Sequence, residues 1–322
     1  MTRARGTLVN AEPAIPPMAT PQPSPFRHEP LAEIDARLLA GWPLPQLGEE
    51  SDKEERGRVL VIAGSREMPG AAWLAAVSAL RAGAGKLQVA TAASVAGGLA
   101  LRLPEARVIG LPETSSGGFT MSGLERLEPL LGKVDAIVVG PGLQDETATR
   151  LFTRGLVERA RRVAFVLDAL AMNVVADFSD FERPPLLTPH AGEMAHLSGA
   201  SKEDIEAEPE RHAREAAGRW NAIVALKGAT TFIATPDGRA WRHAKGHVGL
   251  ATSGSGDVLA GIVGGLAARG ASLEQAAAWG VALHARAGLA LAERVGLLGY
   301  LASELPAEVP RLMERLARGE AR

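Results

Sequence analysis

The residues best suited to chemistry in this sequence lie in one glycine-rich stretch that leads into an apolar segment. Residues 252–257 of this stretch read TSGSGD. Backbone N–H groups at the start of a helix have no intrahelical acceptor and carry the positive end of the helix dipole. Glycines let an anion approach these N–H groups closely. The stretch therefore predicts a phosphate-binding turn that lacks the lysine of a P-loop.

Asp257 closes this turn, and its carboxylate would lie beside the bound phosphate. An acid in that place is electrostatically unfavourable unless it takes part in the reaction. It is suited to removing a proton from a substrate hydroxyl that is about to be phosphorylated. The alternative interpretation is structural: Gly254 and Gly256 form a tight turn, and Asp257 caps the next helix, because aspartate is a favoured N-cap residue.

Several other catalytic motifs are absent from the sequence. It contains no GxGxxG dinucleotide fingerprint, no GxxxxGK[ST] P-loop, no HExxH zinc motif and no GxSxG nucleophile elbow. The chain has no cysteine, which excludes disulfides, thiol catalysis and cysteine-ligated metal centres. His243 and His247 are four residues apart, but they fall in an expected hairpin and loop with no third ligand nearby. We therefore expect no metal site there.

Composition and charge exclude further classes of protein. The 322 residues are 46% hydrophobic and 22% charged, which suits a chain with a sizeable buried core. The formal net charge of -2 gives no field that would attract a polyanion, and 4% aromatic residues are too few for stacking on single-stranded nucleic acid. No stretch reaches the roughly 18 apolar residues of a membrane span. We expect a cytoplasmic protein that binds neither nucleic acid nor membranes.

Strand and helix patterns alternate along the chain and must position the glycine-rich turn. Apolar and β-branched runs predict strands over 58–63, 86–90, 134–139, 163–168 and 223–226. Helical patterns are found over 71–82, 147–161, 258–268 and 273–293. The turn at 236–238 (PDG) predicts a hairpin between 230–235 and 239–241. This order predicts an α/β fold with a mostly parallel sheet, helices on both faces, and ligands beyond the carboxyl ends of the strands.

The first 30 residues differ from the rest of the chain, because seven prolines fall between positions 13 and 30. Such a segment cannot bury enough apolar area to offset the entropy lost on ordering. We expect residues 1–30 to form a disordered proline-rich tail and residues 31–322 to form a single domain. Apolar residues within 31–47 predict a short helix that leads into this domain.

The glycine-rich turn with Asp257 resembles the anion hole and catalytic aspartate of the ribokinase-like fold. Other segments narrow the resemblance: 64–65 (GS), 68–72 (MPGAA), 81–85 (RAGAG), 140–142 (GPG), 187–190 (LTPH), 192–194 (GEM), 226–231 (LKGATT) and 299–305 (GYLASEL). In this order and spacing they are similar to the NAD(P)H-hydrate dehydratases. The resemblance covers about residues 56–316.

This resemblance implies a lyase that repairs a damaged coenzyme. Members of the family phosphorylate the ring hydroxyl of the S-epimer of hydrated NADH or NADPH, and phosphate then leaves to restore NAD(P)H. Bacterial members similar to this chain use ADP and release AMP, eukaryotic members use ATP, and Mg2+ is normally required. The sequence does not decide whether ADP or ATP is the phosphoryl donor, or whether hydrated NADH or hydrated NADPH is the preferred substrate. Family members are often tetramers, so a homo-oligomer is expected.

The resemblance also implies a role for particular residues. Asp257 matches the catalytic base of the family. Gly254, Ser255 and Gly256 match the residues whose N–H groups bind the transferred phosphoryl group. The positions that contact the hydrated dinucleotide are matched by Ala71, Gly142, His190 and Asp257. The segment that binds the nucleotide diphosphate is matched by Lys227, Gly228, Ala229, Thr230 and Thr231, with Gly256 closing that site. No residue is assigned as a metal ligand.

Structural interpretations of these residues remain open beside the functional ones. Ala71 is also a small residue at a helix start, Gly142 a turn glycine, and His190 a helix-start histidine bound to the backbone. Lys227 is also a solvated charge at a strand end. Glu193 is interpreted as a helix cap in preference to a residue that helps to order Mg2+ through water, and His284 as a core or surface residue.

One departure from the family pattern concerns metal binding. Leu170 replaces the second acid of the family stretch Asp-Ala-Asp-Ala-Leu-Asn, so no metal role is assigned there, whereas Asp168 is kept. Two other functions stay open. One is a ribokinase-like kinase of a small hydroxymethyl heterocycle, and the other is a non-catalytic nucleotide-binding relative, against which the intact Asp257 argues.

Overall fold

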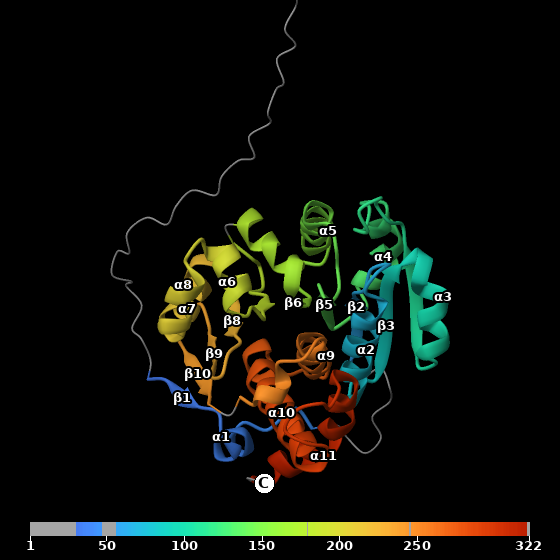
Figure 1. The fold of residues 1–322 in the computed structure, drawn as a ribbon. Coiled ribbons are helices and arrows are strands. Elements are labelled where there is room, and N and C mark those ends of the chain that lie inside the picture. Colours follow the sequence, from blue (N-terminus) through green and yellow to red (C-terminus); the bar gives the residue numbers. More distant parts are fainter. Residues whose placement is uncertain (1–29, 47–55, 179, 245, 321–322) are drawn as a thin grey trace, which may run out of the picture.

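The computed structural model describes residues 30–46, 56–178, 180–244 and 246–320, which are built around one ten-stranded sheet (Figure 1). The strand order is β1-β10-β9-β8-β7-β6-β5-β2-β3-β4. The strands are β1 (Ala32–Glu33), β2 (Arg58–Ile62), β3 (Lys86–Ala92), β4 (Ala106–Leu111), β5 (Ala136–Val139), β6 (Ala164–Leu167), β7 (Leu186–Leu187), β8 (Ile223–Leu226), β9 (Thr231–Ala234) and β10 (Ala240–His243). All neighbouring strands pair in parallel except β9, which is antiparallel to β8 and β10.

Helices cover both faces of this sheet (Figure 1). The α-helices are α1 (Ala36–Gly41), α2 (Pro69–Arg81), α3 (Ala93–Arg102), α4 (Gly123–Leu131), α5 (Glu146–Arg159), α6 (Ala191–Ser198), α7 (Lys202–Ala207), α8 (Pro209–Trp220), α9 (Ser255–Ala268), α10 (Leu273–Arg294) and α11 (Leu305–Ala317). Three 3-10 helices join them: η1 (Ala169–Asp177), η2 (Val248–Leu250) and η3 (Ala302–Glu304).

Alternation along the strands divides the interior into two cores. In β2, Val59 and Val61 face the core formed with α2, α9, α10 and α11, whereas Leu60 and Ile62 face the core formed with α4 and α5. Successive side chains of a strand point to opposite faces, so a strand buried on both faces is apolar throughout. This explains the continuous apolar runs in the sequence.

Helix α9 carries the glycine-rich turn, and small residues fix its place. A Cβ at Gly261 would lie 2.2 Å from the Ala75 carbonyl oxygen, and one at Gly265 would lie 2.4 Å from that of Ala79. A Cβ at Gly264 would lie 2.1 Å from Val138 Cγ2 of β5. These glycines let α9 lie in backbone contact with α2 and directly on the sheet. The start of α9 is therefore held at the carboxyl ends of the strands.

The structure confirms the predicted α/β class and its parallel sheet with helices on both faces. The hairpin around residues 236–238 is formed by β9 and β10. The short helix predicted within 31–47 is α1, and a two-residue strand precedes it. One helix start was predicted wrongly: α9 begins at Ser255 rather than at residue 258. The proline-rich tail predicted for residues 1–30 lies outside the described residues, apart from Pro30.

In the described part of the chain, no helix combines the length and the apolar character that crossing a membrane would require.

Candidate functional site

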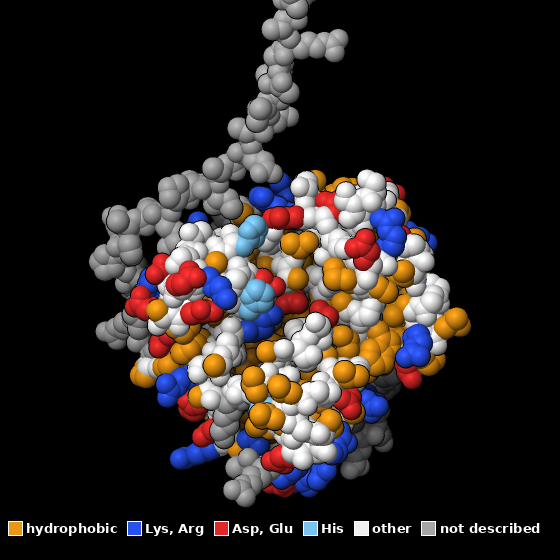
Figure 2. Space-filling view, viewed as in Figure 1, with side chains coloured by type: hydrophobic (Ala, Val, Ile, Leu, Met, Phe, Trp, Pro, Cys, Tyr) orange, Lys and Arg blue, Asp and Glu red, His pale blue; other side chains and the backbone are white. Residues whose placement is uncertain are grey.

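A cavity of about 800 Å³ opens at the carboxyl ends of the central strands. Its wall combines the ends of β6 and β8, the start of α6, the first turn of α9 and one face of α10. Figure 2 shows acidic, basic and histidine side chains side by side near the middle of this face of the molecule. Ligands of open parallel α/β sheets bind at this edge, so the cavity is the candidate active site.

Four residues at this edge follow directly after four neighbouring strands. Gly140 follows β5, Asp168 follows β6, Thr188 follows β7 and Lys227 follows β8. Because parallel strands end at the same edge of a sheet, residues far apart in the sequence become neighbours here. Asp168 and Lys227 line the cavity itself.

The glycine-rich turn forms the start of α9 through a left-handed residue. Gly254 is the N-cap, with φ of 88°, and no side chain caps the helix there. A Cβ at this position would lie 2.5 Å from Leu74 Cδ1 of α2, so both the backbone angle and the space require glycine. Asp257 lies in the first turn of α9 rather than at its N-cap. The structural interpretation of Asp257 as a capping residue is therefore wrong.

The N–H groups of this turn are not equivalent. The Ser255 N–H donates to the Thr252 carbonyl oxygen at 3.2 Å. The N–H groups of Gly256 and Asp257 lie in the first helical turn, where an α-helix provides no acceptor. Of the N–H groups in this turn, those of Gly256 and Asp257 are therefore better placed than that of Ser255 to bind a phosphoryl oxygen.

Ser255 contacts a histidine that sequence reasoning left outside the site. Its Oγ lies 2.9 Å from His284 Nε2, and both residues line the cavity. Burial lowers the pKa of His284 to about 4, against a smaller opposing effect of Ser255, so the imidazole is neutral near pH 7. No motif surrounds His284 in the sequence, so no signal there could have identified it.

The carboxyl group of Asp257 is strongly perturbed by its surroundings. Burial raises its pKa from 3.8 to about 7, and the negative charge of Asp168 adds to the rise, whereas Lys227 opposes it. Two nearby carboxylates with different environments divide the roles of charge holder and proton acceptor between them. A carboxyl with a pKa near 7 is well matched to general-base catalysis at neutral pH.

Lys227 links the carboxylates to the glycine-rich turn. Its Nζ lies 3.4 Å from Asp168 Oδ1 and 3.8 Å from Glu193 Oε2. A Cβ added at Gly256 would lie 3.4 Å from the same Nζ, so the ammonium group is adjacent to the first turn of α9. The side chain of Lys227 is 21% exposed and paired, so the interpretation of Lys227 as a solvated charge is wrong.

His190 and Glu193 form a reciprocal cap at the start of α6. The Gly192 and Glu193 N–H groups donate to His190 Nδ1 at 3.0 and 3.2 Å, and the His190 N–H donates to Glu193 Oε2 at 2.8 Å. The interpretation of Glu193 as a cap is confirmed. His190 lines the cavity as well, so its capping bonds leave it in reach of a ligand.

Ala71 and Gly142 lie together beside the glycine-rich turn but are not among the residues that line the cavity. A Cβ at Gly142, whose φ is 65°, would lie 2.5 Å from Ala71 Cβ. Ala71 lies in the first turn of α2, one turn before Leu74, which contacts Gly254. The two small residues thus let the loop after β5 pack closely against the first turn of α2.

The predicted nucleotide segment is divided between two neighbouring cavities. Lys227, Gly228 and Ala229 line both the main cavity and a second one of about 760 Å³ between α6 and α7. Thr231 lines only the main cavity, and Thr230 lines only the second. Of the predicted residues of the turn, Ser255, Gly256 and Asp257 line the main cavity, whereas Gly254 lies behind it.

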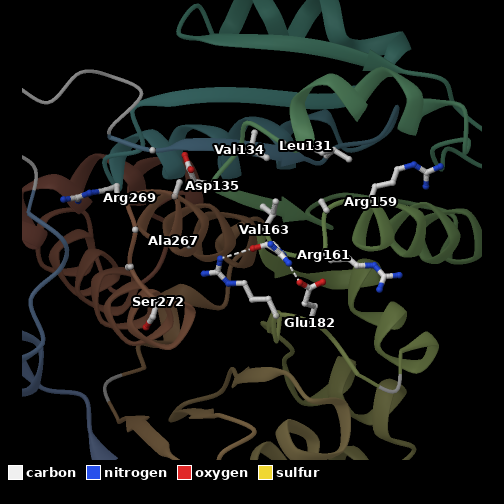
Figure 3. A pocket seen from close by; sticks show the side chains of 18 of the residues that line it. Leu131, Val134, Asp135, Arg159, Arg161, Val163, Glu182, Ala267, Arg269 and Ser272 are labelled. Carbon is white, nitrogen blue, oxygen red and sulfur yellow. Dashed lines mark hydrogen bonds and ion pairs between the residues drawn. The ribbon is translucent and has the colours of Figure 1, made fainter.

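A larger cavity of about 1140 Å³ lies at the opposite, amino-terminal edge of the sheet (Figure 3). Helices α4, α5 and α9 end there, so the negative ends of three helix dipoles point toward it. Its arginines are engaged: Arg162 pairs with Glu182 at 2.8 Å, and Arg183 donates to the Arg162 carbonyl oxygen. This cavity therefore lacks the features of a phosphate site.

Comparisons with known proteins point to one enzyme family. A family model described as NAD(P)H-hydrate dehydratase matches residues 59–311. The chain is 48% identical to the ADP-dependent (S)-NAD(P)H-hydrate dehydratase of Xanthomonas campestris pv. campestris, over 89% of this chain and 97% of that protein.

Two further similarities extend this result. The chain is 38% identical to the bifunctional NAD(P)H-hydrate repair enzyme Nnr of Moorella thermoacetica, over 87% of this chain and 54% of that protein, so it spans about half the length of that relative. The solved structure of ADP/ATP-dependent NAD(P)H-hydrate dehydratase from Bacillus subtilis, co-crystallized with ATP/Mg2+, matches with a TM-score of 0.76 and 30% identity. That match covers 89% of this chain and 99% of the other.

Proposed function

This chain belongs to the NAD(P)H-hydrate dehydratase family, and from that premise we propose that it dehydrates the S-epimer of hydrated NADH or NADPH at the expense of ADP. The observation that carries the proposal is the place of Asp257. Its buried carboxyl, with a pKa of about 7, lies in the first turn of α9, and the Lys227 ammonium lies beside the neighbouring Gly256.

The first step is phosphoryl transfer to the ring hydroxyl. Asp257 takes the hydroxyl proton as the oxygen attacks the β-phosphorus of ADP, and AMP leaves. The Gly256 and Asp257 N–H groups and the Lys227 ammonium stabilise the charge on the transferred group. One preorganised donor of this kind typically contributes roughly 10²–10³ in rate.

The second step restores the ring. The C–O bond breaks, inorganic phosphate leaves, and the adjacent ring carbon loses a proton to form the double bond. Hydrated NAD(P)H and ADP are thereby converted to NAD(P)H, AMP and phosphate. The oxygen of the added water ends in the phosphate, which accounts for every atom.

The remaining site residues are assigned to the two ligands. We propose that Ala71, Gly142 and His190 contact the hydrated dinucleotide, because Ala71 and Gly142 are small residues packed together near the turn and His190 lines the cavity. The segment from Lys227 to Thr231 is assigned to the nucleotide, with Gly256 closing that side. The division of this segment between two cavities supports a ligand that runs across it.

Mg2+ is the metal that the family implies. In the portion of the chain described here, no three acidic or histidine side chains gather closely enough to hold a metal. The site still fits Mg2+, because this ion keeps several waters and is commonly held by one or two carboxylates and nucleotide phosphates. Glu193, which lines the cavity, would supply a carboxylate of this kind. When bound, Mg2+ neutralises phosphate charge.

Assembly and location complete the proposal. We propose that residues 31–322 act as one dehydratase domain in a cytoplasmic homo-tetramer. Exposed apolar side chains between α10 and α11 support an interface between copies: Val295, Leu297, Leu298 and Leu301. Val248 of η2 is exposed as well.

The direct test is to incubate the enzyme with hydrated NADH and Mg2+, with ADP, with ATP or with neither, and to follow the reduced-nicotinamide absorbance. We expect restoration of NADH with ADP and none without nucleotide. A hydroxymethyl thiazole or pyrimidine with ATP serves as the competing substrate. Phosphorylation of that alcohol without restoration of NADH would replace the dehydratase by the kinase alternative.

A further inference from the structure

Asp168 is a buried carboxylate that does not serve its own helix. It is the N-cap residue of η1, yet its side chain accepts no hydrogen bond from the first turn. Aspartate at an N-cap normally accepts such a bond. Instead, Asp168 Oδ1 accepts from Thr188 Oγ1 at 2.6 Å and from Lys227 Nζ at 3.4 Å. The carboxylate is therefore directed at partners from two other strand ends.

The backbone around Asp168 is shaped to hold this orientation. The next residue, Ala169, has a φ of 47°, which is unfavourable for a residue with a side chain. A Cβ at Gly140, which follows β5, would lie 1.8 Å from the Asp168 carbonyl oxygen. Unfavourable backbone conformations persist where the surrounding structure enforces them, and they cluster at functional sites.

The partner of Asp168 has a flexible side chain that needs a fixed position. A lysine ammonium is a compact charge on a four-carbon stem, and it does not align itself as an arginine fork does. In this site the Asp168 carboxylate lies on one side of Lys227 Nζ, and Gly256 of the glycine-rich turn lies close by. The ion pair thus sets where the positive charge lies relative to α9.

Building on the proposed function, we propose that Asp168, held by Thr188, is the positioning residue that fixes the Lys227 ammonium beside Gly256 and sets the electrostatic environment of Asp257. Asp168 touches neither reacting group in this role. Its effect on the reaction passes through Lys227 and through its own charge. The same charge contributes to the raised pKa of Asp257.

Other groups in the cavity also act on Asp257, and the test must separate them from Asp168. The titratable side chains that line the cavity with Asp257 come from every surrounding element: Asp168, His190, Glu193, Lys227, His243, His247 and His284. Removing the Asp168 charge lowers the Asp257 pKa, whereas removing the Lys227 charge raises it. These opposite signs distinguish the two residues.

The decisive variant is Asp168→Asn, which keeps the size of the side chain and removes its charge. We expect kcat to fall roughly 100-fold through misplacement of the ammonium. The KM for ADP should stay equal or decrease, because a negative charge near the phosphates is lost. The acid limb of the pH profile should move to lower pH. The matched control is Asp177→Asn, which removes the partner of Arg150 at the other end of η1. This variant should change neither kcat nor the pH at which the acid limb lies.

A wild-type kcat with an unmoved acid limb in folded Asp168→Asn protein would overturn the inference. If that variant does not fold, Thr188→Val, which removes only the hydroxyl donor, should lower kcat in the same direction without raising the KM for ADP. An unchanged kcat there would equally overturn it.

A second readout does not depend on turnover. The Asp257 carboxyl can be titrated by carbon NMR in aspartate-labelled protein, with Asp257→Asn identifying the signal. Its pKa should be lower in Asp168→Asn than in wild type, and an equal value would overturn the inference. If wild type restores no NADH with either nucleotide, the proposed function fails, while this titration still decides the role of Asp168.

Discussion

Replacing Asp257 by asparagine separates the catalytic role of this carboxylate from its cost to stability. The raised pKa means that the folded protein holds the Asp257 proton up to about pH 7, whereas the unfolded chain loses it near pH 3.8. Below pH 3.8 both states are protonated and the difference vanishes. As the pH rises toward 7, ionisation favours the unfolded chain, and wild type loses stability that the asparagine variant keeps.

The magnitude follows from the two pKa values. A change from 3.8 to about 7 corresponds to about 4 kcal/mol at neutral pH and above, at roughly 1.4 kcal/mol per tenfold change. About 3 kcal/mol of this difference develops between pH 5 and pH 8, because the carboxyl group in the folded protein ionises only near the upper end of that range. The same substitution, Asp257→Asn, should lower kcat by roughly 10²–10⁴-fold, because base catalysis contributes about that factor.

The assay is urea unfolding of wild type and Asp257→Asn at pH 5 and pH 8. We expect the free energy of unfolding of the variant, relative to that of wild type, to increase by about 3 kcal/mol from pH 5 to pH 8. The control is Asp135→Asn, which removes a half-exposed carboxylate paired with Arg58 at the opposite edge of the sheet. If wild type and Asp257→Asn change equally with pH, the carboxyl does not have a raised pKa, and its assignment as a base active near neutral pH is refuted.

Three further outcomes follow from the geometry of the site. The value of kcat/KM for hydrated NADH should fall about tenfold per pH unit well below pH 7, because Asp257 must be ionised to accept the proton; a flat profile from pH 5 to 9 would contradict this. Gly254→Ala should cost about 1–3 kcal/mol and lower kcat, measured by unfolding and turnover, because its φ is 88° and a Cβ would meet Leu74. Gly199→Ala, with φ of 79° in open space, is the control for the backbone angle alone. Lys227→Met should raise the KM for ADP roughly tenfold or more and move the acid limb to higher pH, and unchanged kinetics would remove Lys227 from the phosphate site.

Much of the fold was predictable because its strands are buried on both faces. The run 59–63 is apolar throughout, and most of it lies in β2, an interior strand with parallel partners on both sides. By contrast, β7 is only two residues long, too short for a pattern in the sequence to reveal. The start of α9 was misplaced because Ser255, Gly256 and Asp257 are weak helix formers, and packing against α2 overrides that preference.

The site was predictable where a single segment carries it and not where the sheet assembles it. The turn 252–257 and its similarity to the family identify Asp257, and the comparisons confirm the family and its dehydratase activity. Thr188 and His284 were not assigned to the site, because strand order brings Thr188 to Asp168 and helix packing brings His284 to the cavity. Asp168 carried one usable signal: an acidic residue at the end of a predicted strand.

The central claim is that dehydration proceeds through transfer of one phosphoryl group from the nucleotide to the coenzyme. Its most direct measurement is the ratio of NADH restored to AMP and to inorganic phosphate formed, from a defined amount of hydrated NADH with excess ADP. A ratio of one to one to one is the predicted result. NADH restored without AMP, or AMP formed without NADH, would contradict the claim.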